Sequence, residues 1–355
     1  MGYNARRKGG GSVITPDLFP QTAPPVQRST MNGKPVFSVP AKSVLNLDSG
    51  FKHKLLCGGP TFSAGSACAY SCEYCYVEDL MRKNPHWQAV QAQQSGTAFA
   101  DVVIRRAGAV DALRRQLTFA DGQPRFNDPS DRRVIYASPL VDVAANMELV
   151  RETVEACKVI LALTHWHIRL LSKSNLLPKV AAELPPDRII YGVSAGTLDD
   201  GLAKAFERGT PLVSKRIESL HWLQDRGFRT FGMVCPSLPQ VDCAEFSGTM
   251  MRAIRADRCE HVWGEVINLR GDSFTRTIHA LTLAGYVDQA VRVTKVCEDK
   301  EVWEDYARAT FDAHAYELRR HTGPDGKPKL RFLQYVTAQS KPWWKAREAD
   351  GAILL

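Results

Sequence analysis

The sequence predicts an α/β protein built on a partial (β/α)6 barrel of the TIM type, and three observations lead to this fold class. From about residue 55 onward, apolar strand-like runs alternate with amphipathic stretches, which is the pattern of βαβ units with a parallel sheet. A chain of 355 residues is long enough to bury one such barrel with appendages. A compact cysteine loop also follows the first expected strand, at the end of a barrel where functional loops gather.

The barrel is expected over residues 41–270, and its elements follow one another along the chain. The strand-like runs are residues 133–137, 167–171, 188–193, 229–234 and 261–267. Between them, apolar residues recur at helical spacing over residues 146–163, 174–183, 212–226 and 242–257. No internal repeat accompanies this rhythm.

The two ends of the chain are expected to differ from the barrel. Residues 1–40 carry Gly, Pro, Ser, Thr and Gln with little periodicity, including Gly9-Gly10-Gly11 and Pro24-Pro25. Such a composition predicts a flexible N-terminal arm that becomes ordered only on the body or on a partner. Residues 271–355 are expected to form a C-terminal helical extension that packs on the barrel.

The charge balance favours a polyanionic partner. The chain has 46 Lys and Arg against 38 Asp and Glu, a formal net charge of +8. Among the densest basic segments are Arg105–Arg115 and Arg319–Arg331, which we expect to guide a nucleic acid to the barrel mouth. An ordinary solvated basic surface explains the same composition, so charge alone leaves both interpretations open.

The composition also indicates a reducing, cytoplasmic setting and no membrane partner. The chain contains no run of 18 apolar residues, and its first residues lack the apolar core of a signal peptide. The nine cysteines are an odd number, and most are scattered in apolar contexts. Cysteines used in this way are typical of proteins without a disulfide framework.

The most informative motif is a group of three cysteines, Cys68, Cys72 and Cys75, with the spacing Cys-x3-Cys-x2-Cys. Soft thiolates favour iron–sulfur clusters, and three of them can hold three irons of a cubane 4Fe–4S cluster. The fourth iron is then open to a small molecule. A zinc knuckle is the alternative, but it needs a second pair of Cys or His ligands, and none stands nearby.

This cysteine loop resembles that of the radical S-adenosylmethionine (SAM) enzymes. The resemblance implies that SAM binds the open iron. One electron, from a donor of the flavodoxin or ferredoxin type, then yields a 5′-deoxyadenosyl radical that abstracts hydrogen. Tyr74, just before the third cysteine, also fits the family pattern, which implies that its backbone meets the adenine of SAM.

A closer resemblance, to the spore photoproduct lyase branch of DNA-repair photolyase-like proteins, covers about residues 55–270. It is carried by the cysteine loop, a Ser-Lys ending of the third strand, a serine ending the fourth, and the run Phe206-Glu207-Arg208-Gly209-Thr210. The resemblance implies that Lys173 and Ser194 hold the SAM carboxylate. It also implies lyase-like or repair-like chemistry on a nucleic acid.

One departure from that branch concerns the hydrogen-atom donor. The lyases carry a cysteine just after the second strand, where this chain has Ser138. An O–H bond is much stronger than an S–H bond, so serine is a poor hydrogen-atom donor. Either Cys235, at the end of the fifth strand, supplies the hydrogen, or the reaction is not thymine-dimer reversal; we favour the second.

Three functions stay open at this point. The first is a radical SAM enzyme that acts on a nucleic-acid or nucleotide-like substrate, with Cys235 and Ser138 as the candidate catalytic residues. The second is a biosynthetic radical SAM enzyme for a peptide or small metabolite. The third is a non-catalytic iron–sulfur protein that binds nucleic acid; it has no use for a carboxylate-binding pair such as Lys173 and Ser194.

Overall fold

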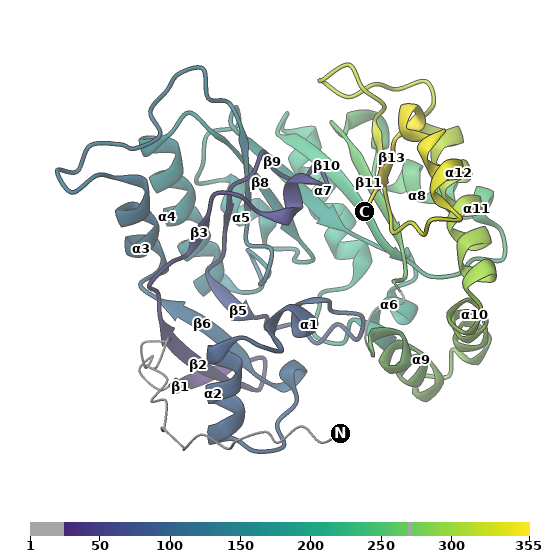
Figure 1. The fold of residues 1–355 in the computed structure, drawn as a ribbon, viewed down its shortest axis with the longest axis horizontal. Coiled ribbons are helices and arrows are strands. Elements are labelled where there is room, and N and C mark those ends of the chain that lie inside the picture. Colours follow the sequence, from purple (N-terminus) through teal and green to yellow (C-terminus); the bar gives the residue numbers. More distant parts are fainter. Residues whose placement is uncertain (1–24, 269–271) are drawn as a thin grey trace, which may run out of the picture.

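Two β-sheets organise the chain in the computed structural model, which describes residues 25–268 and 272–355 (Figure 1). The larger sheet has nine strands in the order β13-β12-β11-β10-β9-β8-β7-β4-β3, and the smaller has the order β1-β2-β6-β5. The strands of the larger sheet are β3 (Leu45–Asn46), β4 (Thr61–Phe62), β7 (Val134–Ala137), β8 (His167–Ser172), β9 (Ile189–Ser194), β10 (Arg229–Ser237), β11 (Val262–Val266), β12 (Leu330–Gln334) and β13 (Ala352–Leu354). Those of the smaller sheet are β1 (Val26–Met31), β2 (Lys34–Pro40), β5 (Gly65–Ala67) and β6 (Val103–Ala107).

The larger sheet is parallel from β4 to β13, and only β3 runs antiparallel to its neighbour β4. Helices lie between successive parallel strands along the chain, as crossover connections of parallel strands usually contain them. The mixed α/β fold class with a parallel barrel-type sheet, predicted from the alternation of strand-like and helical runs, is thereby confirmed.

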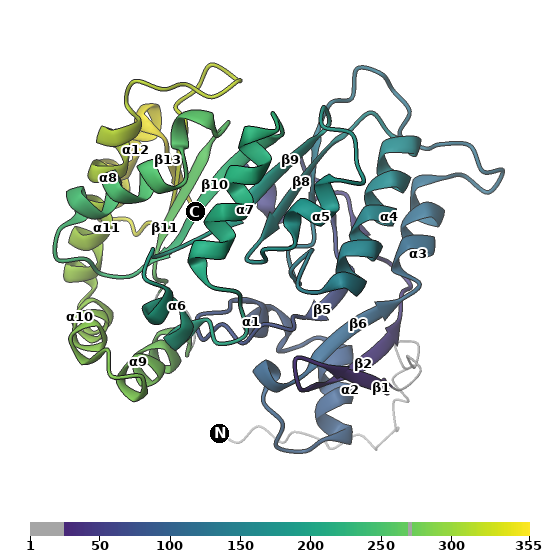
Figure 2. The ribbon, with the colours of Figure 1, turned by 180° about the vertical axis from the view of Figure 1, so that it is seen from behind.

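Helices cover the outer face of this sheet, with α7 on β9 and β10 and α11 on β11 and β12 (Figure 2). The α-helices are α1 (Val77–Met81), α2 (Pro85–Gln93), α3 (Ala109–Leu117), α4 (Met147–Leu163), α5 (Leu177–Ala181), α6 (Asp200–Phe206), α7 (Val213–Asp225), α8 (Cys243–Ala253), α9 (Ser273–Leu283), α10 (Val287–Glu298), α11 (Lys300–Leu318) and α12 (Lys341–Lys345). Four 3-10 turns are η1 (Gly50–Lys52), η2 (Phe99–Asp101), η3 (Ala256–Arg258) and η4 (Glu348–Asp350). No helix in the described part of the chain is long and apolar enough to cross a membrane.

The five predicted strands correspond to β7 through β11, and the four predicted helices to α4, α5, α7 and α8. Two helices are shorter than predicted, for local reasons. The side chain of Ser174 accepts a hydrogen bond from the backbone N–H of Leu176, a turn that delays the start of α5. Helix α8 stops before Arg255, whose φ of 48° is left-handed and incompatible with a continuing helix.

The flexible-arm prediction is wrong for residues 26–40, which form the hairpin β1–β2. The turn between the strands is Asn32-Gly33, with φ values of 52° and 76°, as a two-residue hairpin turn requires. Strand β2 then pairs in parallel with β6, so the hairpin belongs to the smaller sheet. Residues 1–24 of the expected arm lie outside the described residues.

The C-terminal region contains the four helices α9 to α12, but it also contributes two strands that the sequence analysis missed. Strand β12 pairs with β11 and β13 pairs with β12, both in parallel, so the region continues the barrel sheet. Residues 269–271, at the expected boundary, are outside the described part.

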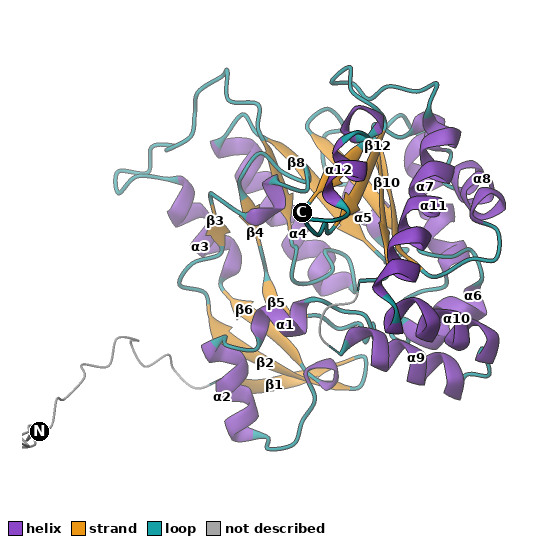
Figure 3. Ribbon diagram, turned by 45° about the vertical axis from the view of Figure 1, so that its right-hand side comes forward, coloured by secondary structure: helices purple, strands orange, loops and turns teal. Residues whose placement is uncertain are grey.

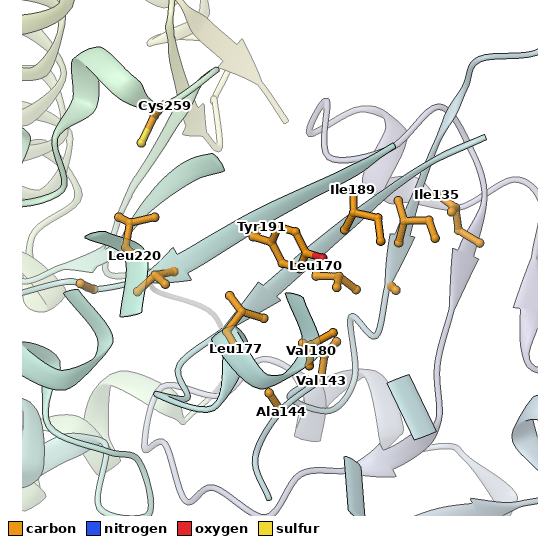
Figure 4. Close-up of a cluster of buried hydrophobic side chains, with 14 of the residues drawn as sticks. Ile135, Val143, Ala144, Leu170, Leu177, Val180, Ile189, Tyr191, Leu220 and Cys259 are labelled. Atoms are coloured by element: carbon orange, nitrogen blue, oxygen red, sulfur yellow. The ribbon is translucent and has the colours of Figure 1, made fainter. Parts of the chain in front are cut away.

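Side chains alternate between the two faces of the sheet, because successive residues of a strand point to opposite sides. On the outer face, an apolar core packs against the helices, and Figure 4 shows part of it. Its labelled members are Ile135, Val143, Ala144, Leu170, Leu177, Val180, Ile189, Tyr191, Leu220 and Cys259. The inner face carries a second cluster, to which the segment 51–57 contributes Leu56 and Cys57.

That segment is held across the inner face by a buried arginine of β8. The guanidinium of Arg169 donates to the backbone carbonyls of Leu55 (3.0 Å) and Leu56 (2.7 Å). It also lies over the rings of Phe231 and Trp263, at 5.4 and 4.8 Å from their centroids. One face of the sheet is therefore closed by helices and the other, in part, by this loop.

Candidate active site at the carboxyl ends of the strands

Three of the predicted site residues fall on the inner face of the sheet, near the carboxyl ends of neighbouring strands. Lys173 follows β8, Ser194 ends β9, and Cys235 lies near the end of β10. Leu171, two residues before Lys173, belongs to the inner cluster together with Cys235. The period of two along a strand therefore directs Lys173 to the same side. Parallel barrels place their functional groups at these ends.

Lys173 and Ser194 are in direct contact. The ammonium Nζ of Lys173 donates to Oγ of Ser194 at 3.0 Å, and that hydroxyl donates to the backbone carbonyl of Cys235 at 3.1 Å. The backbone N–H of Lys173 donates to a carboxylate oxygen of Asp142 at 2.7 Å, which fixes the turn after β8. The structure thus brings together the two residues expected to hold a carboxylate.

Lys173 lies in an electronegative, largely dry environment. Its ammonium is 3.9 Å from a carboxylate oxygen of Glu207 and 5.5 Å from the centroid of the Tyr74 ring. Burial lowers the pKa of Lys173, but the charge of Glu207 and the neighbouring Cys72 raise it more, so the net shift is upward. Lys173 is therefore a stable cation at neutral pH.

Glu207 is the centre of a buried polar network that the sequence analysis did not assign a role. It forms an ion pair with Arg216 of α7 at 2.6 Å and accepts a hydrogen bond from the Tyr74 hydroxyl. Arg216 is fully buried, and its guanidinium also donates to the carbonyl of Ser194 at 3.2 Å. This network ties the cysteine loop, the end of β9 and helix α7 to one carboxylate.

The cysteine loop packs directly against the segment that carries Glu207. Cys72 forms an antiparallel backbone bridge with Glu207, and the backbone N–H of Glu73 donates to the carbonyl of Phe206 at 2.9 Å. Gly209 lies against the loop so closely that a Cβ there would come within 3.1 Å of the Tyr70 Cα atom. A residue larger than glycine at position 209 would push the loop away.

On its other side, the loop is attached to the smaller sheet and to the end of β7. Cys68 follows β5 directly, and its sulfur accepts a hydrogen bond from the backbone N–H of Asp142 at 3.4 Å. Figure 3 shows β5 and α1, which flank the loop, between the two groups of strands. The loop is thus held from both sheets.

The three thiols have raised pKa values in the cluster-free chain. Burial raises the pKa of Cys68 to about 11, holds that of Cys72 well above the usual range, and raises that of Cys75. The other thiols of the loop add to the shifts of Cys68 and Cys72, which means that the three groups lie near one another. Metal binding would release their protons.

The possible metal ligands of the loop are the free thiols of Cys68, Cys72 and Cys75. Among residues 25–268 and 272–355, no three or more His, Cys, Asp or Glu side chains are arranged to hold one metal ion. A cubane cluster makes a different demand, because each thiolate binds a different iron and the sulfur atoms stay further apart. Three free thiols on one loop are the ligand type that such a cluster takes, and the cluster itself stays a prediction.

Tyr74 and Ser138 are placed near this loop in different ways. The Tyr74 ring packs against Phe206, with centroids 5.6 Å apart. Ser138 is buried at the end of β7 with a φ of 53°, a left-handed conformation that is rare for serine. The carbonyl of the next residue, Pro139, accepts a hydrogen bond from the Tyr76 hydroxyl at 2.7 Å. The roles assigned to Tyr74 and Ser138 stay predictions.

Cys235 faces two groups that the sequence analysis did not single out, Glu265 and Lys54. Its thiol donates to a carboxylate oxygen of Glu265 on β11 at 3.5 Å. Burial and the charge of Glu265 hold the pKa of Cys235 well above its usual range, while Lys173 and Lys54 oppose the shift. Burial lowers the pKa of Lys54, but Glu265 and Tyr335 raise it more. Cys235 is therefore a protonated thiol beside a carboxylate and an ammonium.

The pKa of Cys235 is expected to fall when Glu265 is changed to glutamine, because the repulsion of the thiolate by the carboxylate is removed. Below its pKa, a thiol gains about tenfold in thiolate fraction for each unit by which the pKa falls. Alkylation of Cys235 by iodoacetamide at pH 8, followed on its peptide by mass spectrometry, should accelerate accordingly. Glu260→Gln, at the opposite end of β11, is the control; an unchanged rate in Glu265→Gln contradicts this electrostatic account.

The predicted position of one basic segment is wrong. Residues Arg319–Arg331 connect α11 to the start of β12, so they lie at the amino ends of the parallel strands, whereas Lys173 and Ser194 lie at the carboxyl ends. Figure 1 shows this connection beside β13. Two of its cations are also already engaged. Arg331 pairs with Asp325 at 2.5 Å, and Lys329 donates to the carbonyls of Ala256 and Asp257. The sequence showed the charges but not the chain direction that places them.

The other basic segment is partly engaged as well. Arg105, on β6, forms ion pairs with Glu148 and Glu152 of α4. Arg106 donates to the backbone carbonyls of Ser43 and Ser63, at 3.4 and 3.3 Å. These two guanidinium groups therefore join structural elements of the protein.

Taken with its strand order, the chain has the fold class of a partial parallel barrel with a cysteine loop after the first parallel strand. Among solved structures, it is similar to spore photoproduct lyase complexed with dinucleoside spore photoproduct, with a TM-score of 0.48 and 10% sequence identity over 70% of this chain and 66% of the lyase chain. It is also similar to a mutant of that lyase with bound AdoMet (SAM) and dinucleoside spore photoproduct, with a TM-score of 0.49 and 9% identity over the same shares.

The match thus spans about two thirds of the lyase chains, 66% of their length. No protein-family model and no curated protein sequence matches the chain.

Proposed function

We propose that this protein is a radical SAM enzyme that abstracts hydrogen from a nucleic-acid or nucleotide-like substrate. The observation that carries the proposal is the contact between Lys173 and Ser194, 3.0 Å apart at adjacent strand ends and beside the cysteine loop. A ligand carboxylate bound there would lie between the loop and the inner face of the sheet. Cys68, Cys72 and Cys75 would hold a 4Fe–4S cluster. When bound, that cluster supplies the electron that cleaves SAM to the 5′-deoxyadenosyl radical.

In this proposal, Lys173 binds the SAM carboxylate through its charge, and Ser194 orients it with a hydrogen bond. Glu207 keeps the lysine protonated, and Arg216 neutralises the second oxygen of Glu207. The lysine is thereby held in place by a carboxylate that forms an ion pair with Arg216. Such preorganisation reduces the cost of ordering the site when the ligand binds.

On the substrate side, we assign hydrogen-atom return to Cys235 rather than to Ser138. A hydrogen-atom donor must carry its hydrogen, and burial together with Glu265 keeps the Cys235 thiol protonated. The phenols of Tyr76 and Tyr136 lie within electrostatic range of this thiol and of each other.

A nucleic-acid or nucleotide-like substrate is the class that the net charge of +8 and the resemblance to the photoproduct-lyase branch favour. The lyase structures contain a dinucleoside photoproduct. Lys54, on the inner face beside Glu265, is a cation suited to a phosphate of such a substrate.

The test of this proposal follows hydrogen from the substrate. Anaerobically reconstituted, reduced protein is incubated with SAM and with deuterated oligonucleotides, or with deuterated peptides as the comparison. Deuterium in 5′-deoxyadenosine from an oligonucleotide supports the proposal. Deuterium only from a peptide or a small metabolite favours the biosynthetic alternative, and no 5′-deoxyadenosine at all favours a non-catalytic iron–sulfur protein. Cys235→Ala should still form 5′-deoxyadenosine but lose its product.

Replacing Lys173 with methionine should weaken SAM binding about 10- to 100-fold, because a charge-assisted hydrogen bond contributes about 1.5–3 kcal/mol. The cluster should stay bound, since Lys173 is not one of its ligands. Equilibrium dialysis of cluster-loaded protein with labelled SAM measures the affinity, and iron per chain checks the loading. The exposed Lys179 on α5, changed to methionine, is the matched control. Equal SAM affinity in the wild type and Lys173→Met would remove Lys173 from the SAM site.

A further inference from the structure

The side chain of Lys34 contains a buried amine without a hydrogen-bond partner. Its Nζ atom is shielded from solvent and makes no hydrogen bond with any residue in the described ranges. A buried ammonium is costly unless it is paired with an anion. The described residues offer the Lys34 ammonium no hydrogen-bond partner, so an anion that arises only when a ligand binds would stabilise it.

The hairpin of the smaller sheet places Lys34 near the cysteine loop. Lys34 is the first residue of β2, directly after the Asn32-Gly33 turn, and pairs with Met31 across the hairpin. Strand β2 adjoins β6, β6 adjoins β5, and β5 leads into Cys68. Met31 and Val36 also pack in one apolar cluster with Ala69, inside the loop. The hairpin and the loop are therefore in contact around Lys34.

The charged and titratable groups near Lys34 are Cys68, Cys72, Asp101 and Arg208. Burial lowers the pKa of Lys34, Cys68, Asp101 and Cys72 raise it, and Arg208 lowers it further. Arg208 is itself paired with Glu73 at 2.6 Å. Two of the groups that act electrostatically on this ammonium are thus thiols of the candidate cluster motif.

We propose that Lys34 is the counter-ion of the iron–sulfur cluster held by Cys68, Cys72 and Cys75, and that it raises the reduction potential of that cluster. The inference rests on the proposed function. A 4Fe–4S core of charge 2+ with three thiolates carries one net negative charge, and one added electron makes it two. A nearby cation stabilises the doubly negative state more than the singly negative one. The Lys34 ammonium therefore gains a negatively charged partner when the cysteine loop binds the cluster.

The role of Lys34 is tested on protein loaded anaerobically with ferrous iron and sulfide. A dithionite titration followed by electron paramagnetic resonance measures the midpoint potential. Lys34→Met should shift the ratio of reduced to oxidised cluster about tenfold toward the oxidised form, which for one electron lowers the potential by about 59 mV. Lys34→Arg, which keeps the charge, should restore it. Lys42→Met, an exposed lysine just beyond the end of β2, is the control and should leave the potential unchanged.

Two further measurements separate this inference from a structural role and from the proposed function. Thermal unfolding of the cluster-free protein should show Lys34→Met to be at least as stable as the wild type, because the variant removes an unpaired buried amine. A wild-type potential in Lys34→Met overturns the inference, and so does a loss of cluster-free stability without a change in potential. Failure of the wild type itself to take up iron and sulfide would instead overturn the proposed cluster.

Discussion

Changing Cys68, Cys72 and Cys75 together to alanine is expected to abolish cluster binding. The wild type, loaded with iron and sulfide, should hold about four of each per chain and absorb near ~400 nm, as thiolate-bound iron–sulfur clusters do. The triple variant should hold none, because it lacks all three thiolates that are proposed to bind the irons. Iron and sulfide analysis with the absorption spectrum measures the result.

The control for the cysteine variants is Cys243→Ser. Cys243 begins α8 on the outer side of the barrel, and its sulfur contacts the Thr310 hydroxyl. Its loss should leave iron and sulfide at the wild-type level. Loading that persists near four irons per chain in the triple variant would show that other residues bind the cluster.

Changing Glu207 to glutamine is expected to cost about 3–5 kcal/mol of the free energy of unfolding, the usual result of removing one partner from a buried ion pair. Arg216 is fully buried and would keep only neutral acceptors, and Lys173 would lose its nearest carboxylate. Urea unfolding of the cluster-free protein, which excludes any contribution of the metal, measures the change. The glutamine keeps the volume of the side chain, so packing is not altered at the same time.

Two further variants show whether the loss of stability in Glu207→Gln comes from the unpaired charge of Arg216. Glu218→Gln breaks an exposed pair with Lys215 and should change the unfolding free energy by only about 0–1 kcal/mol. The double variant Glu207→Gln with Arg216→Met should recover part of the loss, because no unpaired buried charge remains. A change below about 1 kcal/mol in Glu207→Gln would mean that water reaches and solvates Arg216.

The sequence predicted those parts of the site that depend on local order along a strand. Lys173 and Ser194 end apolar runs, and parallel strands bring such ends together, so their contact followed from the pattern. Glu207 belongs to the run Phe206-Glu207-Arg208-Gly209-Thr210 that carried the family resemblance, but its partner Arg216 lies on the next helix, α7. Both residues have polar and charged neighbours in the sequence, so neither stands out as buried. No spacing rule marks a pair that becomes buried only when the helix packs.

The sequence analysis missed the hairpin and the last two strands for different reasons. The Asn32-Gly33 turn was a usable signal, but Pro24-Pro25 and the glycines before it dominated the composition of the region. Strand β12 has only five residues, of which three are apolar and one is charged, too short a run to separate from a loop. To predict the position of Arg319–Arg331, one must know in which direction α11 runs, and composition does not give that direction.

The hairpin has a practical consequence for shortened versions of the protein. A chain trimmed at residue 41, which the composition invites, would strip β2 from β6 and leave a free strand edge with unpaired backbone groups. It would also uncover apolar side chains of the smaller sheet such as Val103 and Ala69, both packed against the hairpin. Such an edge recruits other chains, so the trimmed protein should aggregate. The N-terminal segment, whose composition resembles that of a dispensable tail, thus supplies two of the four strands of the smaller sheet.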